Sequence, residues 1–136
     1  MKIYIVAVGR LRERYHIEAE RRFLARIRNK ADIRIMEITS PGKGSAEQEG
    51  EEMLSRIPNG FKTIMLDVGG KSTDTMELAG EMAAGEVAFL IGGPDGYGEN
   101  VYEKIPRRMS LSAMTYTHQT ARLLLLEQIE MILNPG

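Results

Sequence analysis

A chain of 136 residues has the length of a single domain that can bury a hydrophobic core. With no cysteine and only two histidines, His16 and His118, a disulfide framework and a thiolate or all-histidine metal site are excluded, and we predict no metal cofactor. The formal net charge is -1, but the charge is unevenly distributed along the chain. Residues 2–34 carry ten basic and four acidic side chains, and the rest of the chain carries eight basic and fifteen acidic ones.

The first segments predict two strands around one helix. Residues 2–8, KIYIVAV, are rich in β-branched side chains and predict a strand. Apolar side chains at helical spacing then predict a helix over about 11–30. Alternating apolar and polar side chains over 33–39 predict a second strand, and SPGKGS at 40–45 predicts a turn.

The middle of the chain continues this alternation. The acidic segment 45–57 predicts a second helix in spite of Gly50. Residues 62–68 predict a third strand that ends at the glycine pair 69–70. Ser72 or Thr73 is then expected to cap a third helix that runs to about residue 84, because either hydroxyl can accept from the first-turn N–H groups.

The remaining segments predict a strand over 86–92, a short helix near 98–106, a strand over 108–114 and a final helix over 118–133. Alternating strands and helices predict an α/β fold with a mainly parallel sheet and helices on both faces. No repeat or long linker divides the chain, so we expect one domain over residues 1–136.

The final helix is apolar on more than one side. Leu123, Leu124, Leu125 and Leu126 cover the whole circumference of a turn. A deeply buried central helix would explain this pattern. In so small a protein we favour a second surface that meets another subunit, and therefore predict a homodimer.

The chain shows no signal of a membrane or secreted protein. No apolar run approaches the ~18 residues needed to span a bilayer. The start, MKIYIVAVGR, lacks the long apolar region and cleavage site of a secretory signal. We expect a soluble, cytoplasmic protein.

The segment FLIGGPDGYG, residues 89–98, is the most unusual stretch. Gly92 and Gly93 follow a predicted strand, at the sheet edge where open α/β folds bind ligands. The loops after the third and fifth strands should lie at the same edge, and the glycines would let a flat ligand lie against bare backbone. Alternatively, residues 94–96 form only a tight turn.

Phosphate-binding motifs are not supported. LDVGGKST follows a strand, but Met65 stands where the P-loop pattern requires a glycine. GGPDGYG does not match the dinucleotide fingerprint in any register. An unrelated nucleotide-binding α/β protein is therefore a weaker alternative.

Four segments, LDVGGK, FLIGGPDG, SLSAMTYTHQTAR and LLLLEQI, occur in an order and spacing that resemble the ribosomal large-subunit pseudouridine N3-methyltransferase family. This family belongs to the SPOUT methyltransferases, and the resemblance covers nearly the whole chain. It implies a C-terminal trefoil knot, a homodimer, S-adenosylmethionine as cofactor, and methylation of N3 of a pseudouridine in 23S ribosomal RNA on the assembled ribosome.

The resemblance also implies the site. The family's cofactor contacts fall on the following positions of this chain: Leu66, Gly93, Leu111, Ser112, Ala113, Met114, Thr115 and Tyr116. His118 matches a family histidine and is the candidate catalytic base, because its pKa range suits proton transfer; a structural hydrogen-bonding role is the alternative. Arg122 would hold a phosphate, brace the loop or pack in the helix.

The end of the chain departs from the family pattern. Family members continue after LLLLEQI with an aromatic-containing helical stretch and a histidine-proline-tyrosine-histidine tail, whereas this chain reads LLLLEQIEMILNPG. The resemblance therefore leaves a second possibility open, a catalytically impaired ribosome-binding dimer. In either case the basic residues are expected to face RNA, and they are Arg10, Arg12, Arg14, Arg21, Arg22, Arg26, Arg28, Arg107 and Arg108.

Overall fold

The computed structural model describes residues 1–39 and 45–136 and confirms the α/β fold. Within these ranges, five parallel strands form one sheet in the order β2-β1-β4-β3-β5. The strands are β1 (Lys2–Val8), β2 (Asp32–Ile38), β3 (Lys62–Ser72), β4 (Glu86–Ile91) and β5 (Arg108–Ser110). The helices are α1 (Arg14–Ile27), α2 (Ala46–Ser55), α3 (Thr75–Met82), α4 (Glu99–Lys104) and α5 (His118–Leu133). The turn predicted at 40–45 falls almost entirely outside the described residues.

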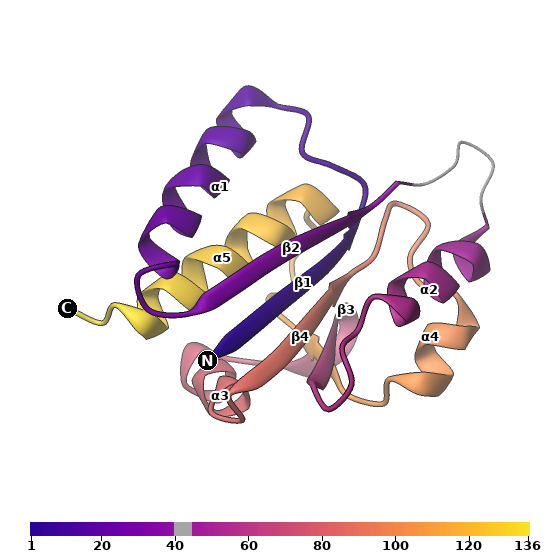
Figure 1. Cartoon of the computed structure of the whole chain (residues 1–136). Helices are drawn as coiled ribbons and strands as arrows, with labels where there is room; N and C mark the ends of the chain where they lie inside the picture. Colours follow the sequence, from indigo (N-terminus) through magenta and orange to yellow (C-terminus); the bar gives the residue numbers. More distant parts are fainter. Residues whose placement is uncertain (40–44) are drawn as a thin grey trace.

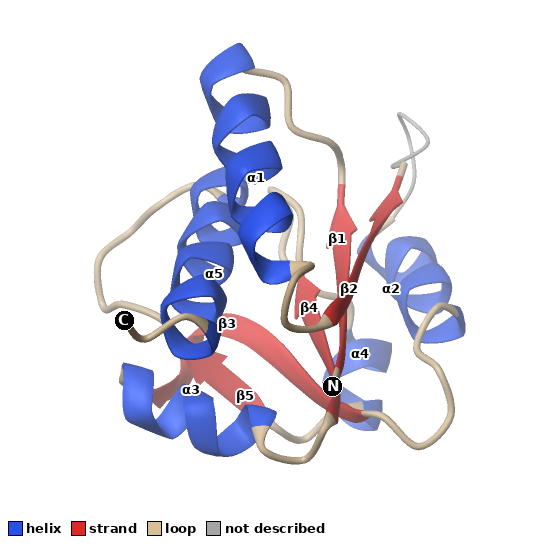
Figure 2. Cartoon of the chain, turned by 60° about the vertical axis from the view of Figure 1, so that its left-hand side comes forward, coloured by secondary structure: helices blue, strands red, loops and turns tan. Residues whose placement is uncertain are grey.

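Helices cover both faces of the sheet, as predicted. Helices α1, α3 and α5 lie on one face, and α2 and α4 lie on the other (Figure 1, Figure 2). Alternate residues of β1 supply the two cores: Ile3 and Ile5 pack toward α1 and α5, and Val6 and Val8 pack toward α2 and α4. A strand that is buried on both sides is apolar at consecutive positions, which explains the run in KIYIVAV.

Strand β3 does not end at its glycine pair, so this part of the prediction is wrong. The strand continues to Ser72 and pairs with β5, with a register shift between Leu66 and Lys71. A Cβ atom added to Gly70 would lie 2.7 Å from the backbone nitrogen of Met109. The glycine is therefore required because two backbones approach closely at a bulge.

The extended strand also moves the start of the third helix. Neither Ser72 nor Thr73 caps α3; the cap is Asp74, whose carboxylate accepts from the backbone N–H of Glu77 at 2.8 Å. The side chain of Glu77 accepts in return from the backbone N–H of Asp74 at 3.3 Å. This reciprocal pair is a capping box, which satisfies two N–H groups at the helix terminus.

Gly50 lies where α2 packs closely against α4. A Cβ atom at this position would lie 2.5 Å from Oδ1 of Asn100. The backbone N–H of Glu99 donates to the carboxylate of Glu47 at 2.9 Å, which ties the two helix starts together. The close contact leaves no room for a side chain, which explains why glycine, a poor helix former, stands inside this helix.

Helix α5 is a central helix of this chain. It lies between α1 and α3 against the sheet, and Leu125, Leu126 and Ile129 are fully buried. Leu123 and Leu124 are half-buried. Packing within one chain therefore accounts for much of the leucine run, and the leucines alone do not require a second subunit. No helix in the described part of the chain is long and apolar enough to cross a membrane.

Candidate active site

A cavity of about 540 Å³ lies at the carboxyl end of β4, where β3 separates from β4 at residues 66–68, beside the start of α5. Its volume falls within the range of small-molecule sites. The described residues that line it are Leu66, Asp67, Val68, Ile91, Gly92, Gly93, Pro94, Gly96, Tyr97, Tyr102, Tyr116, Thr117, His118 and Ala121. The predicted location of a site at this edge of the sheet thus coincides with a cavity of suitable size.

The cavity contains four of the nine predicted site residues: Leu66, Gly93, Tyr116 and His118. The other five residues, 111–115, belong to the adjoining loop and do not line the cavity. Leu111 packs against the core, and the hydroxyl of Ser112 accepts from the backbone N–H of Met114 at 3.0 Å. The side chains of residues 113–115 are exposed.

The glycines of the IGGPDG segment are required by contacts within the chain. A Cβ atom at Gly92 would lie 3.2 Å from the ring of Tyr97, and one at Gly93 would lie 2.8 Å from Cγ1 of Val8. Gly96 has φ of +74° and donates its N–H to the carbonyl of Gly93 at 3.0 Å. The segment therefore forms a tight turn, and side chains of this chain occupy the space beside the two glycines, while both glycines also line the cavity.

We expect the substitution Gly93→Ala to lower the free energy of unfolding by about 1–3 kcal/mol, because the added methyl group overpacks against the stiff, buried Val8. Urea denaturation monitored by circular dichroism measures this change. The matched control is Gly80→Ala in α3, where a Cβ meets no atom within 4 Å and helix propensity improves. Equal stability of Gly93→Ala and the native protein would contradict the proposed steric role.

Tyr97 connects β3 and β4 at the border of the cavity. Its hydroxyl lies 2.6 Å from the carbonyl oxygen of Leu66 in β3 and 2.8 Å from that of Leu90 in β4. Burial raises the pKa of Tyr97, so the phenol keeps the proton that it donates to these carbonyls. Sequence reasoning missed this residue, and its place inside a glycine-rich turn was the only available signal.

A second missed group lies at the mouth of the cavity. The carboxylate of Asp67 accepts from the hydroxyl of Tyr102 at 3.3 Å and from the guanidinium of Arg108 at 3.3 Å. Burial, together with the negative charge of Asp67, raises the pKa of Tyr102. The guanidinium carbon of Arg108 also lies 5.5 Å from the ring centre of Tyr102. These contacts hold the β3 end against α4.

His118 is the first residue of α5 and faces the cavity. Thr117 caps this helix, because its hydroxyl accepts from the backbone N–H of Thr120 at 3.2 Å. Burial lowers the pKa of His118, and the positive charge of Arg12 lowers it further. The imidazole is therefore neutral near pH 7 and has an unprotonated nitrogen that can accept a proton.

Arg122 braces the helices and does not face the cavity. Its guanidinium donates to both carboxylate oxygens of Glu20 in α1, at 2.6 and 2.9 Å, and to Glu37 in β2 at 2.8 Å. Burial alone would lower the pKa of Arg122, but the two carboxylates raise it and keep the group charged. Of the roles considered for this residue, helix packing is the one that the geometry supports, because its partners lie in α1 and β2 and not in the predicted cofactor loop.

The cavity suits a ligand without phosphate. Among the described lining residues there is no lysine or arginine, and the one carboxylate is that of Asp67. Leu66 and Ile91 offer apolar contact, and the backbone at 92–93 offers polar groups. These groups fit a largely apolar, heteroaromatic ligand. In the described part of the chain, no cluster of three or more His, Asp or Glu side chains could hold a metal ion.

Comparison with known proteins gives an independent result. The family described as predicted SPOUT methyltransferases matches residues 1–130. A protein of Pelotomaculum thermopropionicum named ribosomal RNA large subunit methyltransferase H is 36% identical, and the match covers 93% of this chain and 89% of that protein. Proteins of the same name from Syntrophotalea carbinolica and Ruminiclostridium cellulolyticum are 39% and 34% identical, each over 95% of this chain and over 90% and 91% of their own lengths.

These matches confirm the resemblance that the four sequence segments indicated. The matched region includes all the strands described above, the cavity and His118. The chain belongs to the SPOUT methyltransferase family, among the relatives named ribosomal RNA large subunit methyltransferase H.

Proposed function

We propose that this protein is an S-adenosylmethionine-dependent methyltransferase that acts on N3 of a pseudouridine in 23S ribosomal RNA, on the assembled ribosome. The observation that carries the proposal is the cavity itself, whose described lining holds no lysine or arginine and includes His118. Relatives named for methylation of large-subunit ribosomal RNA match the chain over nearly its whole length.

The cofactor is proposed to lie along the strand ends. Leu66 and Ile91 would contact the adenine, and backbone groups at Gly93 and Tyr116 would bind its polar edge. The adjoining residues 111–115 would contribute only if this loop closes on the bound cofactor. Tyr97 fixes the spacing between the two strand ends, so this surface is formed before the ligand arrives. When bound, S-adenosylmethionine supplies a methyl group that its sulfonium already activates.

The catalytic role is proposed for His118. The N3 atom of a pseudouridine carries a proton that must leave when the methyl group is added. A neutral imidazole at the edge of the cavity can accept this proton, and its position at the start of a packed helix holds it in place. Positioning of the nucleotide supplies much of the remaining rate acceleration.

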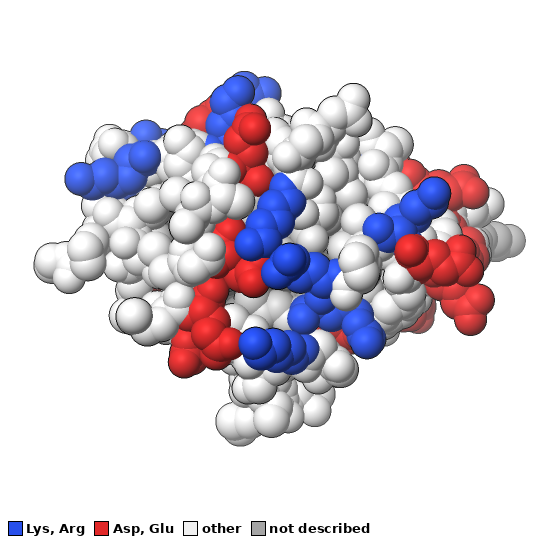
Figure 3. Space-filling model, turned by 90° about the horizontal axis from the view of Figure 1, so that it is seen from below, with Lys and Arg blue, Asp and Glu red and all other residues white. Residues whose placement is uncertain are grey.

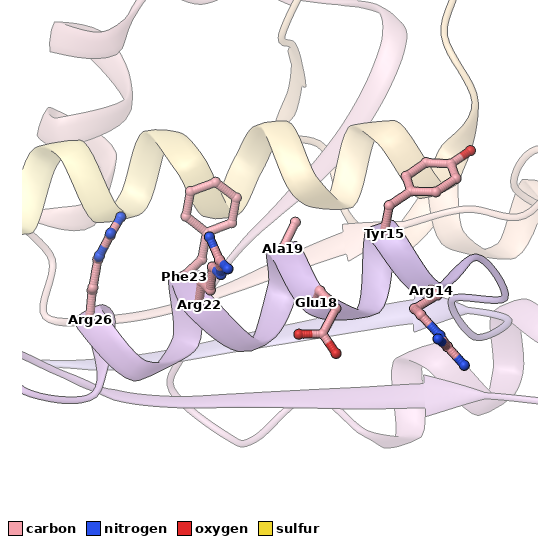
Figure 4. Close-up of a pocket in the computed structure, with 7 residues that line it drawn as sticks. All are labelled: Arg14, Tyr15, Glu18, Ala19, Arg22, Phe23 and Arg26. Atoms are coloured by element: carbon pink, nitrogen blue, oxygen red, sulfur yellow. The ribbon is translucent and has the colours of Figure 1, made fainter.

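We further propose that the protein is a homodimer and that its C-terminal part forms the trefoil knot implied by the family. A surface hollow along α1 supports the dimer, because Tyr15, Ala19 and Phe23 form an apolar strip on one side of this helix (Figure 4). Charged side chains also line the hollow, and they are Arg14, Glu18, Arg22 and Arg26. Tyr15 is 66% exposed in the single chain, which is unusual for an aromatic side chain in such a hollow. A sedimentation-equilibrium mass equal to that of one chain would contradict the dimer.

Two measurements test the proposed function. Calorimetry should detect S-adenosylmethionine binding to the folded protein, and ribosomes from cells that lack the methyltransferase should accept radiolabelled methyl groups, with N3-methylpseudouridine identified by mass spectrometry. Binding without transfer would instead support the catalytically impaired ribosome-binding dimer. Absence of binding would contradict both functions.

A further inference from the structure

The loop between β1 and α1, residues 9–13, presents two arginines on either side of a buried leucine. Gly9 has φ of +85°, which turns the chain at the end of β1, and its N–H donates to the carbonyl of Ile38 at 2.7 Å. Leu11 is only 7% exposed and anchors the loop in the protein. Its neighbours Arg10 and Arg12 are both exposed. The loop therefore holds two positive side chains at a fixed place on the surface.

This loop lies beside the start of α5. Arg10 and Leu11 border a small crevice together with His118 and Gln119. On the other side of the loop, Nδ1 of His16 lies 3.1 Å from Oε1 of Gln119, which ties the start of α1 to the start of α5. His118 thus stands between the cavity and the loop 9–13.

Seven other arginines were expected to face RNA, and four of them form ion pairs with carboxylates. These four are Arg21, Arg26, Arg107 and Arg108. Arg107, for example, donates to both oxygens of Glu81 at 3.0 and 3.1 Å. On the face shown in Figure 3, which carries the amino ends of β1 and β4, basic and acidic side chains lie next to each other. Such a face offers little net attraction to a polyanion.

Arg10 and Arg12 differ from these residues. Among residues 1–39 and 45–136, neither has a carboxylate within ion-pair distance. The charge of Arg12 reaches the catalytic candidate, since it is one of the two causes of the lowered pKa of His118. Arg14, Arg22 and Arg28 also lack such a partner in these ranges, but they belong to α1 and its C-terminal end and not to the edge of the cavity.

We propose that Arg10 and Arg12 bind the RNA phosphates next to the target nucleotide and direct its base past His118 into the cavity. The inference rests on the proposed function and assigns the RNA-binding surface within it. When a cavity encloses the base of a nucleotide, the phosphate stays outside. The protein groups that bind the phosphate must therefore lie at the edge of the cavity. An arginine guanidinium is well suited to the task, because its fork of N–H groups matches two phosphate oxygens.

The test is the salt dependence of binding to assembled ribosomes from cells that lack the methyltransferase. The variant is Arg10→Gln/Arg12→Gln. The matched control, Arg22→Gln/Arg28→Gln, removes two arginines that also lack a carboxylate partner in the described ranges, but from α1 and its end. For two lost phosphate contacts, the slope of log K against log salt should become less steep by about 1.4 to 1.8, and affinity at low salt should fall about tenfold or more. S-adenosylmethionine affinity should remain unchanged.

Each outcome decides the matter. Weakened, less salt-dependent binding in the loop variant with near-native binding in the control supports the proposal. Equal losses in both variants would show a general charge effect and overturn the assignment to this loop. Native binding by the loop variant would overturn the inference alone, provided that the unmodified protein binds and methylates the ribosomes. If the unmodified protein does neither, the proposed function fails and the inference fails with it.

Discussion

The substitution His118→Asn is expected to lower the rate of methyl transfer to ribosomes by about 10²- to 10⁴-fold, the usual contribution of a general base. Asparagine is smaller than histidine and keeps hydrogen-bonding groups, so α5 should still begin at the same residue. It cannot accept a proton near neutral pH. Single-turnover assays with saturating S-adenosylmethionine measure this loss without interference from product release.

The pH dependence of the rate separates proton transfer from a structural role. Protonated imidazole cannot accept a proton, so the native rate should fall as pH decreases through the pKa of His118. Burial and the charge of Arg12 lower that pKa, so the rate should begin to fall only below the usual value of 6.5. Near pH 7 the rate should not change with pH. The acidic limb should be absent in His118→Asn.

His16→Asn is the matched control, because it alters the other histidine of the chain, whose ring contacts Gln119. We expect this variant to keep the acidic limb and most of the rate. A near-native rate in His118→Asn would show that His118 is not the base, even if S-adenosylmethionine still binds.

The substitution Arg122→Met is expected to lower the free energy of unfolding by about 2–4 kcal/mol. Arg122 is 4% exposed and lies between two carboxylates, of which Glu20 is largely buried and Glu37 is more exposed. Methionine fills a similar volume but leaves Glu20 without its partner. Denaturant unfolding of the purified variant measures the change.

Two companion variants test this explanation. Arg21→Met removes an exposed ion pair with Glu18 and should cost less than about 1 kcal/mol. Adding Glu20→Gln to Arg122→Met should recover part of the loss, because it removes the uncompensated carboxylate. A loss that is the same with and without Glu20→Gln would mean that packing, and not charge, sets the stability of this position.

The strands and helices were largely predictable because each has a local signal. The apolar run of β1 and the helical spacing of α5 gave bounds that the structure reproduces. The glycine pair in β3 gave a wrong end for this strand. Glycines usually end a strand, whereas here they allow a bulge against β5. That contact depends on Met109, about forty residues away, and has no local signature.

The site was predictable only in part, for the same reason. Parallel strands bring their carboxyl ends together, so Leu66, Gly93 and His118 could be expected at one edge. The role of Tyr97 depends on carbonyl groups of the backbone, which every residue possesses. The partner of Arg122 in α1 is 102 residues distant, so its packing role was one possibility among several.

Because β4 occupies the middle of the sheet, a nascent chain translated only as far as Gly85 cannot join its two halves. At that stage β2 can align with β1, whereas β3 has neither of its neighbours, and apolar strand edges stay open. The sheet closes only when residues 86–91 insert between earlier strands, a late, long-range step that slows maturation. Helix α5, which carries His118, is translated later still, so the proposed site cannot assemble before this helix has left the exit tunnel.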